Sequence, residues 1–139
     1  MLKTNEEGTG IETFNLGSYR MYVSDEHRFG TDAFLLAYFS QVRKTSIVCD
    51  LCTGCGIIPM ILTKNNSPKL VYAVDIQKEA IELLEKTVEE NRLENVVAPI
   101  CADLRNIEEI APESIDIVTA NPPYMTGGSG FEKYSYAKT

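Results

Sequence analysis

Residues 46–59 read Ser-Ile-Val-Cys-Asp-Leu-Cys-Thr-Gly-Cys-Gly-Ile-Ile-Pro, and this stretch decides the fold of the chain. The apolar run from Ile47 to Leu51 is typical of a strand buried in a parallel sheet. Gly54 and Gly56 predict a tight turn where the backbone can approach a ligand closely, because glycine has no Cβ to block either the turn or the approach. A helix then begins at Ile57. This order of elements predicts an open α/β sheet that binds a nucleotide-like ligand at the turn.

The residues around the glycine turn favour one cofactor class over another. A dinucleotide fingerprint needs a third glycine where this sequence has Pro59. Asp50 instead stands four residues before Gly54, and its carboxylate suits a ligand with an ammonium or sulfonium group and repels a pyrophosphate. Asp75 ends a second apolar run, residues 70–74, at a place where an acid binds ribose hydroxyls. Together these residues predict S-adenosylmethionine as the cofactor.

The composition indicates one soluble globular domain. Of the 139 residues, 44% are apolar and 24% are charged, and the chain is long enough to bury a core. No apolar run approaches the roughly 20 residues of a membrane span, and the N-terminal residues lack the pattern of a secretory signal. We therefore expect a cytoplasmic protein. The net charge of −7 argues against a broad basic surface for nucleic acid, although a local basic patch remains compatible with it.

Three cysteines form the pattern C-x-x-C-x-x-C at positions 49, 52 and 55. The bacterial iron–sulfur run needs a fourth cysteine directly before a proline, and here Met60 follows Pro59 with no cysteine beside it. Cys49 also lies within the expected buried strand, where it would pack as a small hydrophobic side chain. We therefore expect no metal site.

The remaining chain predicts further strands and helices around this centre. We expect a polar and mobile terminus, a hairpin that turns at Gly17-Ser18, two more helices and two more strands. Their expected ranges are residues 1–10 for the terminus, 12–23 for the hairpin, 33–39 and 77–91 for the helices, and 96–100 and 115–120 for the strands. Thr31 or Asp32 can cap the helix at 33–39, or can lie beside the methionine end of the cofactor. Asp103, with the backbone N–H that follows it, can bind an adenine ring.

The sequence Asn121-Pro122-Pro123-Tyr124 follows the last expected strand and suggests chemistry on an amine. The exocyclic amine of a nucleobase is a poor nucleophile because its lone pair is delocalised into the ring. The Asn121 side-chain oxygen and the Pro122 carbonyl can accept its two N–H groups and so favour a pyramidal nitrogen. The two prolines keep the turn rigid and contribute no competing N–H donors. Tyr124 offers a face on which a flipped-out base can stack.

These motifs resemble the amino-methylating class I S-adenosylmethionine-dependent methyltransferases, and more closely the bacterial tRNA(Val) adenine-N6 methyltransferase family. The similar motifs are residues 29–36, 54–59, 75–77 and 121–124, with the glycines at 127, 128 and 130. These motifs are spread along the sequence, and the resemblance extends over nearly the whole chain. The resemblance implies a tRNA substrate and base contacts at Asn121, Pro122, Pro123 and Tyr124. It also implies cofactor contacts at Thr31, Asp50, Gly54, Gly56, Asp75, Ile76, Asp103, Leu104 and Asn121. The motif serves glutamine-side-chain and guanine-N2 enzymes too, and a cofactor-binding module without catalysis is a further alternative.

The resemblance also implies a Rossmann-like sheet. We expect the order 3-2-1-4 for its four strands, helices on both faces, and a division into a tail and hairpin at 1–30 and a methyltransferase domain at 31–139. Such a sheet has seven strands, whereas this sequence ends fifteen residues after Tyr124, so we expect strands five to seven to be absent. The outer edge of the fourth strand, residues 115–119, is then unpaired, so we expect the chain either to self-associate through this edge or to be only marginally stable.

Overall fold

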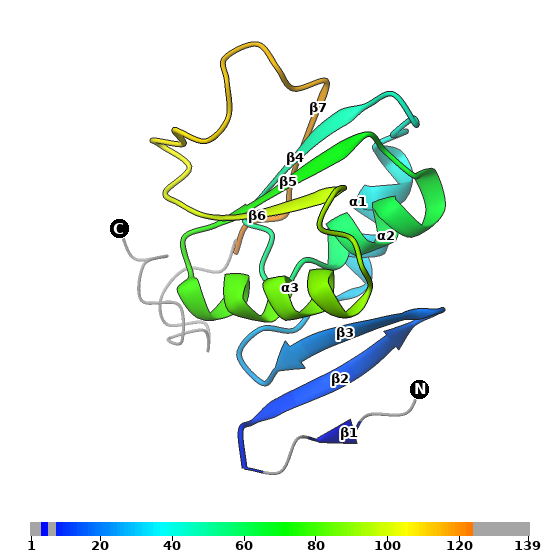
Figure 1. Cartoon of the computed structure of the whole chain (residues 1–139), viewed down its shortest axis with the longest axis vertical. Helices are drawn as coiled ribbons and strands as arrows, with labels where there is room; N and C mark the ends of the chain where they lie inside the picture. The colour runs from blue at the N-terminus through cyan, green and yellow to red at the C-terminus, as the bar shows by residue number, and fades with distance from the viewer. Residues whose placement is uncertain (1–3, 6–7, 124–139) are drawn as a thin grey trace.

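The computed structural model describes residues 4–5 and 8–123 (Figure 1). Tyr124 and the glycines at 127, 128 and 130 therefore lie outside the described residues. No helix in the described ranges is long and apolar enough to cross a membrane. In chain order the elements are β1 (Thr4–Asn5), β2 (Ile11–Leu16), β3 (Tyr19–Ser24), α1 (Thr31–Phe39), β4 (Ile47–Leu51), α2 (Ile57–Asn66), β5 (Leu70–Asp75), α3 (Lys78–Glu90), β6 (Val97–Cys101) and β7 (Ile117–Ala120).

Four parallel strands form the larger sheet in the order β6-β5-β4-β7. This is the predicted order 3-2-1-4, which is confirmed. The register places Asp50 opposite Thr119 of β7, and Asp75 opposite Cys101 of β6. Because parallel strands end at the same edge of a sheet, the carboxyl ends of all four strands lie together. The direction in which successive strands are added to the sheet reverses between β4 and β7. Open α/β sheets bind ligands at the carboxyl ends of the strands where this reversal occurs.

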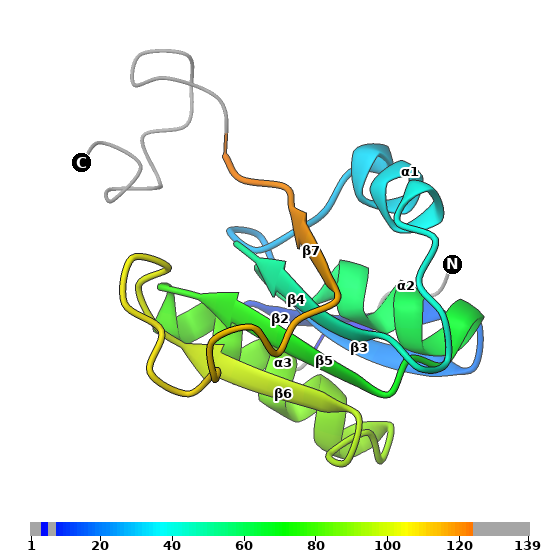
Figure 2. The same ribbon diagram turned by 90° about the horizontal axis from the view of Figure 1, so that it is seen from above.

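The three helices all pack against one face of this sheet, so the structure differs from the expected helices on both faces. Their buried side chains share one cluster with Val48, Val71 and Val97, which lie on that face. Right-handed crossovers explain the arrangement: β4 to β5 and β5 to β6 step in one direction and place α2 and α3 on the same side. The connection from β6 back to β7 steps the other way and crosses the opposite face, and it contains no helix (Figure 2).

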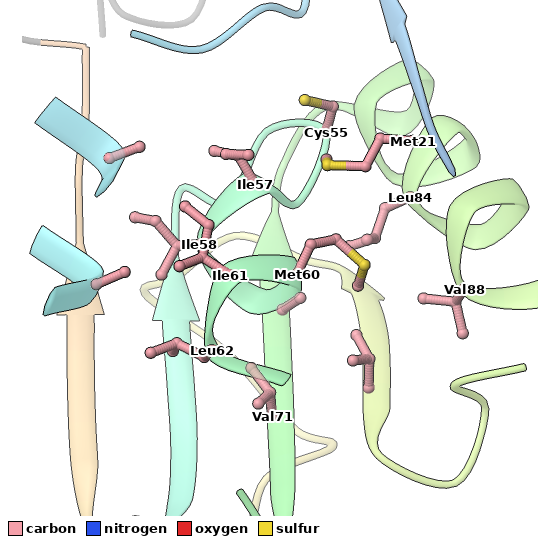
Figure 3. Close-up of a cluster of buried hydrophobic side chains, with 14 of the residues drawn as sticks. Met21, Cys55, Ile57, Ile58, Met60, Ile61, Leu62, Val71, Leu84 and Val88 are labelled. Atoms are coloured by element: carbon pink, nitrogen blue, oxygen red, sulfur yellow. The ribbon is translucent and has the colours of Figure 1, made fainter. Parts of the chain in front are cut away.

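The main core lies between the sheet and the helices (Figure 3). Every residue of α2 from Ile57 to Thr63 is buried, and Pro59 is accommodated in the first turn, where its missing N–H has no helical partner to lose. From α3, Leu84 reaches toward Met60, and both side chains are fully buried. The exposed glutamates of α3 point away from this core, as its periodicity predicts.

The opposite face of the sheet has a smaller core. Cys49, Val74 and Ile100 are buried there, and partly buried apolar side chains of the connection between β6 and β7 pack over them. Three isoleucines supply most of this cover, at positions 107, 110 and 115. A loop thus does on this face what helices do on the other.

The N-terminal hairpin packs on the outer side of α3 and completes a layered order of sheet, helices and hairpin (Figure 1). Met21 is fully buried in the main core, and the backbone N–H of Tyr22 donates to Thr87 Oγ1 at 2.9 Å. The expected mobile terminus is wrong for Thr4 and Asn5, because they form β1 and pair with β2. The division of the chain at residue 30 stays a prediction.

Candidate functional site

A pocket of about 640 Å³ opens at the carboxyl ends of the parallel strands. The loop before α1, the glycine turn, and the segments that follow β5, β6 and β7 supply its wall. Eight of the predicted site residues line it, namely Gly54, Asp75, Ile76, Asp103, Leu104, Asn121, Pro122 and Pro123. Thr31, Asp50 and Gly56 are not among its lining residues, and Tyr124 lies outside the described residues. The volume suits a nucleoside-sized ligand.

The two glycines of the turn have different roles. Both have positive φ angles, 59° at Gly54 and 89° at Gly56, which favour glycine at each position. Gly54 lines the pocket, and a Cβ added there would meet no atom within 4 Å. A Cβ at Gly56 would lie 2.2 Å from Leu84 Cδ1, so this glycine allows the turn to pack against α3. Gly56 is also the N-cap of α2. Gly54 therefore lies where the expected cofactor contact needs it, whereas Gly56 is required for packing against α3, and the cofactor contacts at both glycines stay predictions.

Asp75 is held by the backbone at the floor of the pocket. One carboxylate oxygen accepts the Gly54 N–H at 2.8 Å, and the other accepts the Gln77 N–H at 2.9 Å. The residue is 6% exposed and lines the pocket. A carboxylate has about four acceptor positions, so two remain for the hydroxyls of a ligand. This geometry suits the predicted contact with ribose.

Asp50 lies behind the pocket wall, contrary to the expected contact with a cationic ligand. It is 0% exposed, and its two oxygens accept the hydroxyls of Thr53 and Thr119, each at 2.7 Å. Burial raises the pKa of Asp50 to about 6, although both hydroxyl hydrogen bonds oppose this shift. Asp50 therefore joins β4, the glycine turn and β7 from within, and acts on the pocket through the position of these segments.

Asp103 lies at the mouth of the pocket in a bidentate ion pair with Arg105. The guanidinium Nε lies 3.0 Å from Oδ1, and the terminal nitrogen lies 2.6 Å from Oδ2. Asp103 Oδ1 also accepts the backbone N–H of Arg105. The Arg105 side chain lowers the pKa of Asp103 to about 2, so this carboxylate is an acceptor across the physiological pH range. Leu104 beside it is 55% exposed and offers an apolar surface to a ring.

Asn121 and Asp32 connect the end of β7 to the start of α1. Asn121 Nδ2 donates to Asp32 Oδ2 at 3.2 Å, and both residues line the pocket. Thr31 is exposed and does not line the pocket; neighbouring residues of a helix point about 100° apart, so only one of the pair faces it. The expected capping role is wrong, because the helix begins at Thr31 with Gly30 as N-cap and no side-chain cap.

The cysteines are free thiols. Burial raises the pKa of Cys49 to about 11 and that of Cys55 to about 12, and it also raises the pKa of Cys52. These groups are therefore protonated near neutral pH, whereas a metal binds the thiolate. Within residues 4–5 and 8–123 no three His, Cys, Asp or Glu side chains are grouped so that they could hold a metal ion.

Asp32 lines the pocket, as the sequence allowed, but several other side chains of the pocket wall were not expected there. They are His27, Arg28, Phe29, Cys52, Gln77 and Arg105. Gln77 and Arg105 each stand two residues after an acid at or just past the end of a strand. Residues just past the strand ends line such pockets, so this position in the sequence could have indicated both. His27 and Phe29 belong to the loop before α1, and no local pattern indicates which of its side chains turn inward.

Comparison with known proteins identifies the fold and a family. Residues 36–126, well over half of the chain, match the model of the TRM5/TYW2 methyltransferase domain. The tRNA1(Val) (adenine(37)-N6)-methyltransferase of Tolumonas auensis is 28% identical over 102 residues, which are 73% of this chain and 42% of that protein. The chain thus spans less than half the length of this curated relative.

Two solved structures have the same fold. The tRNA m1G37 methyltransferase of M. jannaschii matches with a TM-score of 0.62 and 28% identity, over 73% of this chain and 33% of that one. M. capricolum TrmK, in complex with its cofactor product S-adenosyl-homocysteine, matches with a TM-score of 0.55 and 26% identity, over 68% and 41%. The target atoms named for these relatives differ, so the comparisons leave the target atom open. The family model nevertheless covers most of the sheet and the pocket, and the chain belongs to the TRM5/TYW2 methyltransferase domain family of class I methyltransferases.

Proposed function

We propose that this protein transfers a methyl group from S-adenosylmethionine to an exocyclic amine of RNA, namely adenine N6 in a tRNA of the tRNA(Val) type. One observation carries the proposal: Asn121, Pro122 and Pro123 lie in the wall of the same pocket as Gly54 and Asp75. The residues proposed to bind the amine and those proposed to bind the nucleoside part of the cofactor thus line one pocket. Methyl transfer from a nucleoside cofactor to an amine needs this arrangement.

The cofactor is S-adenosylmethionine. Methyltransferase relatives of the same fold support it, and one of them was solved with the demethylated product. Asp75 would bind the ribose hydroxyls with its remaining acceptor positions, and Asp103 with the N–H of Leu104 would bind the adenine. Ile76, 46% exposed, would pack on the adenine face, and the open space beside Gly54 would take the methionine end. When bound, this cofactor supplies an electrophilic methyl group on a sulfonium.

The chain itself prepares the amine. Asn121 Oδ1 and the Pro122 carbonyl accept its two N–H groups, which withdraws the lone pair from the ring and directs it outward. Pro122 and Pro123 have no N–H of their own that could compete for these acceptors. Both prolines are exposed at the pocket rim, where a base can reach them from solvent. Tyr124 would provide the stacking surface for that base.

Alternative substrates fit the same motif. A glutamine side chain or guanine N2 also presents a planar nitrogen with two N–H groups, and a module that binds the cofactor without catalysis would keep the pocket alone. Adenine N6 in tRNA is favoured by the relative from Tolumonas auensis, whose name specifies that atom. We propose tRNA as the macromolecular partner for the same reason, and we keep the cytoplasmic location expected from the sequence as a proposal.

Substitution of Asn121 tests the function. Asn121→Ala should lower methyl transfer by about 100-fold or more while cofactor affinity changes by no more than about threefold, because the lost contact is with the amine. Radiolabelled methyl incorporation into unmodified tRNA, and in parallel into a ribosome release factor, measures transfer and discriminates between the two substrates. Isothermal titration measures cofactor binding. Binding without transfer to either acceptor in the unsubstituted protein would favour the non-catalytic alternative.

We also propose that the chain self-associates through β7. Within the described residues β7 pairs with β4 alone, so its other edge presents unpaired backbone groups. Val118 on this strand is 59% exposed, and an exposed apolar edge is a template for pairing with another strand. Pairing with β7 of a second copy would satisfy the unpaired backbone groups of both strands at once.

A further inference from the structure

We infer that Asp32 is a positioning residue that fixes the orientation of the Asn121 side-chain amide, and this inference rests on the proposed function of Asn121. An asparagine amide can turn over and exchange its oxygen and nitrogen at little cost. In the proposed reaction only one orientation works, because the amine must meet the oxygen. Some other group must therefore select that orientation before the substrate binds.

Asp32 has the chemistry to make this selection. An ionised carboxylate only accepts hydrogen bonds, so it binds the NH₂ end of the amide and repels the oxygen end. The structure has this contact, with Asn121 Nδ2 donating to Asp32 Oδ2 at 3.2 Å. Since the oxygen and nitrogen of an amide point to opposite sides of its carbon, Oδ1 turns away from Asp32 and remains available to an N–H donor.

Asp32 is itself held in place. Its other oxygen, Oδ1, accepts the backbone N–H of Ala33 at 3.1 Å, within the first turn of α1. Ala33 is 1% exposed and packs in the main core, so the carboxylate stands on a rigid element. Asp32 is the acidic residue in the first turn of α1, where a carboxylate interacts favourably with the helix dipole. Both oxygens of Asp32 thus have defined partners, and one of these partners, Asn121, is 89 residues away in the chain.

An exchange of the two residues tests this pairing. Asp32→Asn presents either end of an amide to Asn121 and removes the selection, whereas Asn121→Asp places two carboxylates in contact. The double variant D32N/N121D restores a hydrogen bond of reversed direction, and the carboxylate now at position 121 can still accept an N–H from the amine. Glu79→Gln is the matched control, since Glu79 is an exposed acid in the first turn of α3 and does not line the pocket.

Initial rates of methyl incorporation into an unmodified tRNA transcript pool, with cofactor affinity from calorimetry, give the result. We expect each single variant to lose about tenfold or more in kcat while the Kd of S-adenosylmethionine stays within about threefold. The double variant should exceed both single variants in kcat, and Glu79→Gln should equal the unsubstituted protein. Additive losses in the double variant, or a parallel loss of cofactor affinity in Asp32→Asn, would overturn the inference in favour of independent roles or a direct cofactor contact.

Nuclear magnetic resonance separates this inference from the proposed function. The side-chain amide protons of Asn121 in ¹⁵N-labelled protein report the bond to Asp32 without any reaction. We expect Asp32→Asn to shift them and to accelerate their exchange with water, and Glu79→Gln to leave them unchanged. Unperturbed resonances in Asp32→Asn would refute the pairing even in an active enzyme. Conversely, a chain that transfers no methyl group but shows the expected shifts would refute the proposed function alone.

Discussion

The two glycines of the turn can each be replaced by alanine, and only the new methyl group at position 56 should clash with a core side chain. Gly54→Ala and Gly56→Ala introduce the same methyl group into residues with positive φ angles of 59° and 89°. The left-handed conformation costs an L-residue about 1–2 kcal/mol. The reduced entropy of the unfolded chain offsets part of this cost equally in both variants, so it cancels when they are compared.

The steric contribution distinguishes them. The new Cβ would meet nothing within 4 Å at position 54, but would lie 2.2 Å from Leu84 Cδ1 at position 56. Leu84 is fully buried and cannot move aside freely. Overpacking of a core costs about 1–3 kcal/mol. We therefore expect Gly54→Ala to lower the free energy of unfolding by about 1–2 kcal/mol, and Gly56→Ala by about 2–5 kcal/mol, as the sum of both effects.

Urea denaturation measures these values, provided that the slope m is unchanged. Leu84→Ala supplies the control: in that background Gly56→Ala should cost only the backbone contribution of about 1–2 kcal/mol, which corresponds to a coupling of about 1–3 kcal/mol. Cofactor titration should give the opposite ranking, with affinity lowered by Gly54→Ala at the pocket wall and retained by folded Gly56→Ala. Equal costs for the two glycine variants, or no coupling with Leu84, would refute the assignment of Gly56 to packing.

Three further predictions concern Asp75, Asp50 and β7. Asp75→Ala should weaken cofactor binding by about 1.5–3 kcal/mol, because charge-assisted bonds to ribose are lost; an unchanged dissociation constant in calorimetry would contradict the ribose contact. Burial raises the pKa of Asp50 from 3.8 to about 6 in the folded protein, so the folded state binds more protons between these values. The contribution of this raised pKa to the free energy of unfolding is fully present below pH 3.8 and is lost as the pH rises through 6. At 1.36 kcal/mol per pKa unit, the free energy of unfolding should fall by about 3 kcal/mol over this range. Denaturation from pH 4 to 7 should show this fall, and Asp50→Asn should reduce it; an unaltered slope in the variant would assign the fall to other groups. Val118→Lys should shift the sedimentation coefficient toward the monomer at micromolar concentration, since a charge on an edge strand opposes pairing; a protein that is already a compact monomer would rule out the β7 interface.

The main features of the fold could be predicted because they depend on local patterns. The apolar run at 47–51, the two glycines and the amphipathic α3 each reflect a short-range preference of the backbone or a regular spacing of apolar residues. Right-handed crossovers then order the strands. The same local reasoning placed Gly54, Asp75, Asp103 and Asn121 at strand ends, and the structure brings these four together in one pocket.

Tertiary structure decided which side chains face that pocket and which support it. Asp50 is a carboxylate at a strand end like Asp75, yet it turns inward to Thr119, a residue 69 positions later that only the sheet register brings near. The choice of Asp32 over Thr31 depends on where α1 begins and how its alanines pack. The sequence by itself determined the elements and the residue types at the ligand-binding edge, because these follow from short-range chemistry. The partners of each polar side chain were decided by contacts between distant segments, which exist only when the chain is folded.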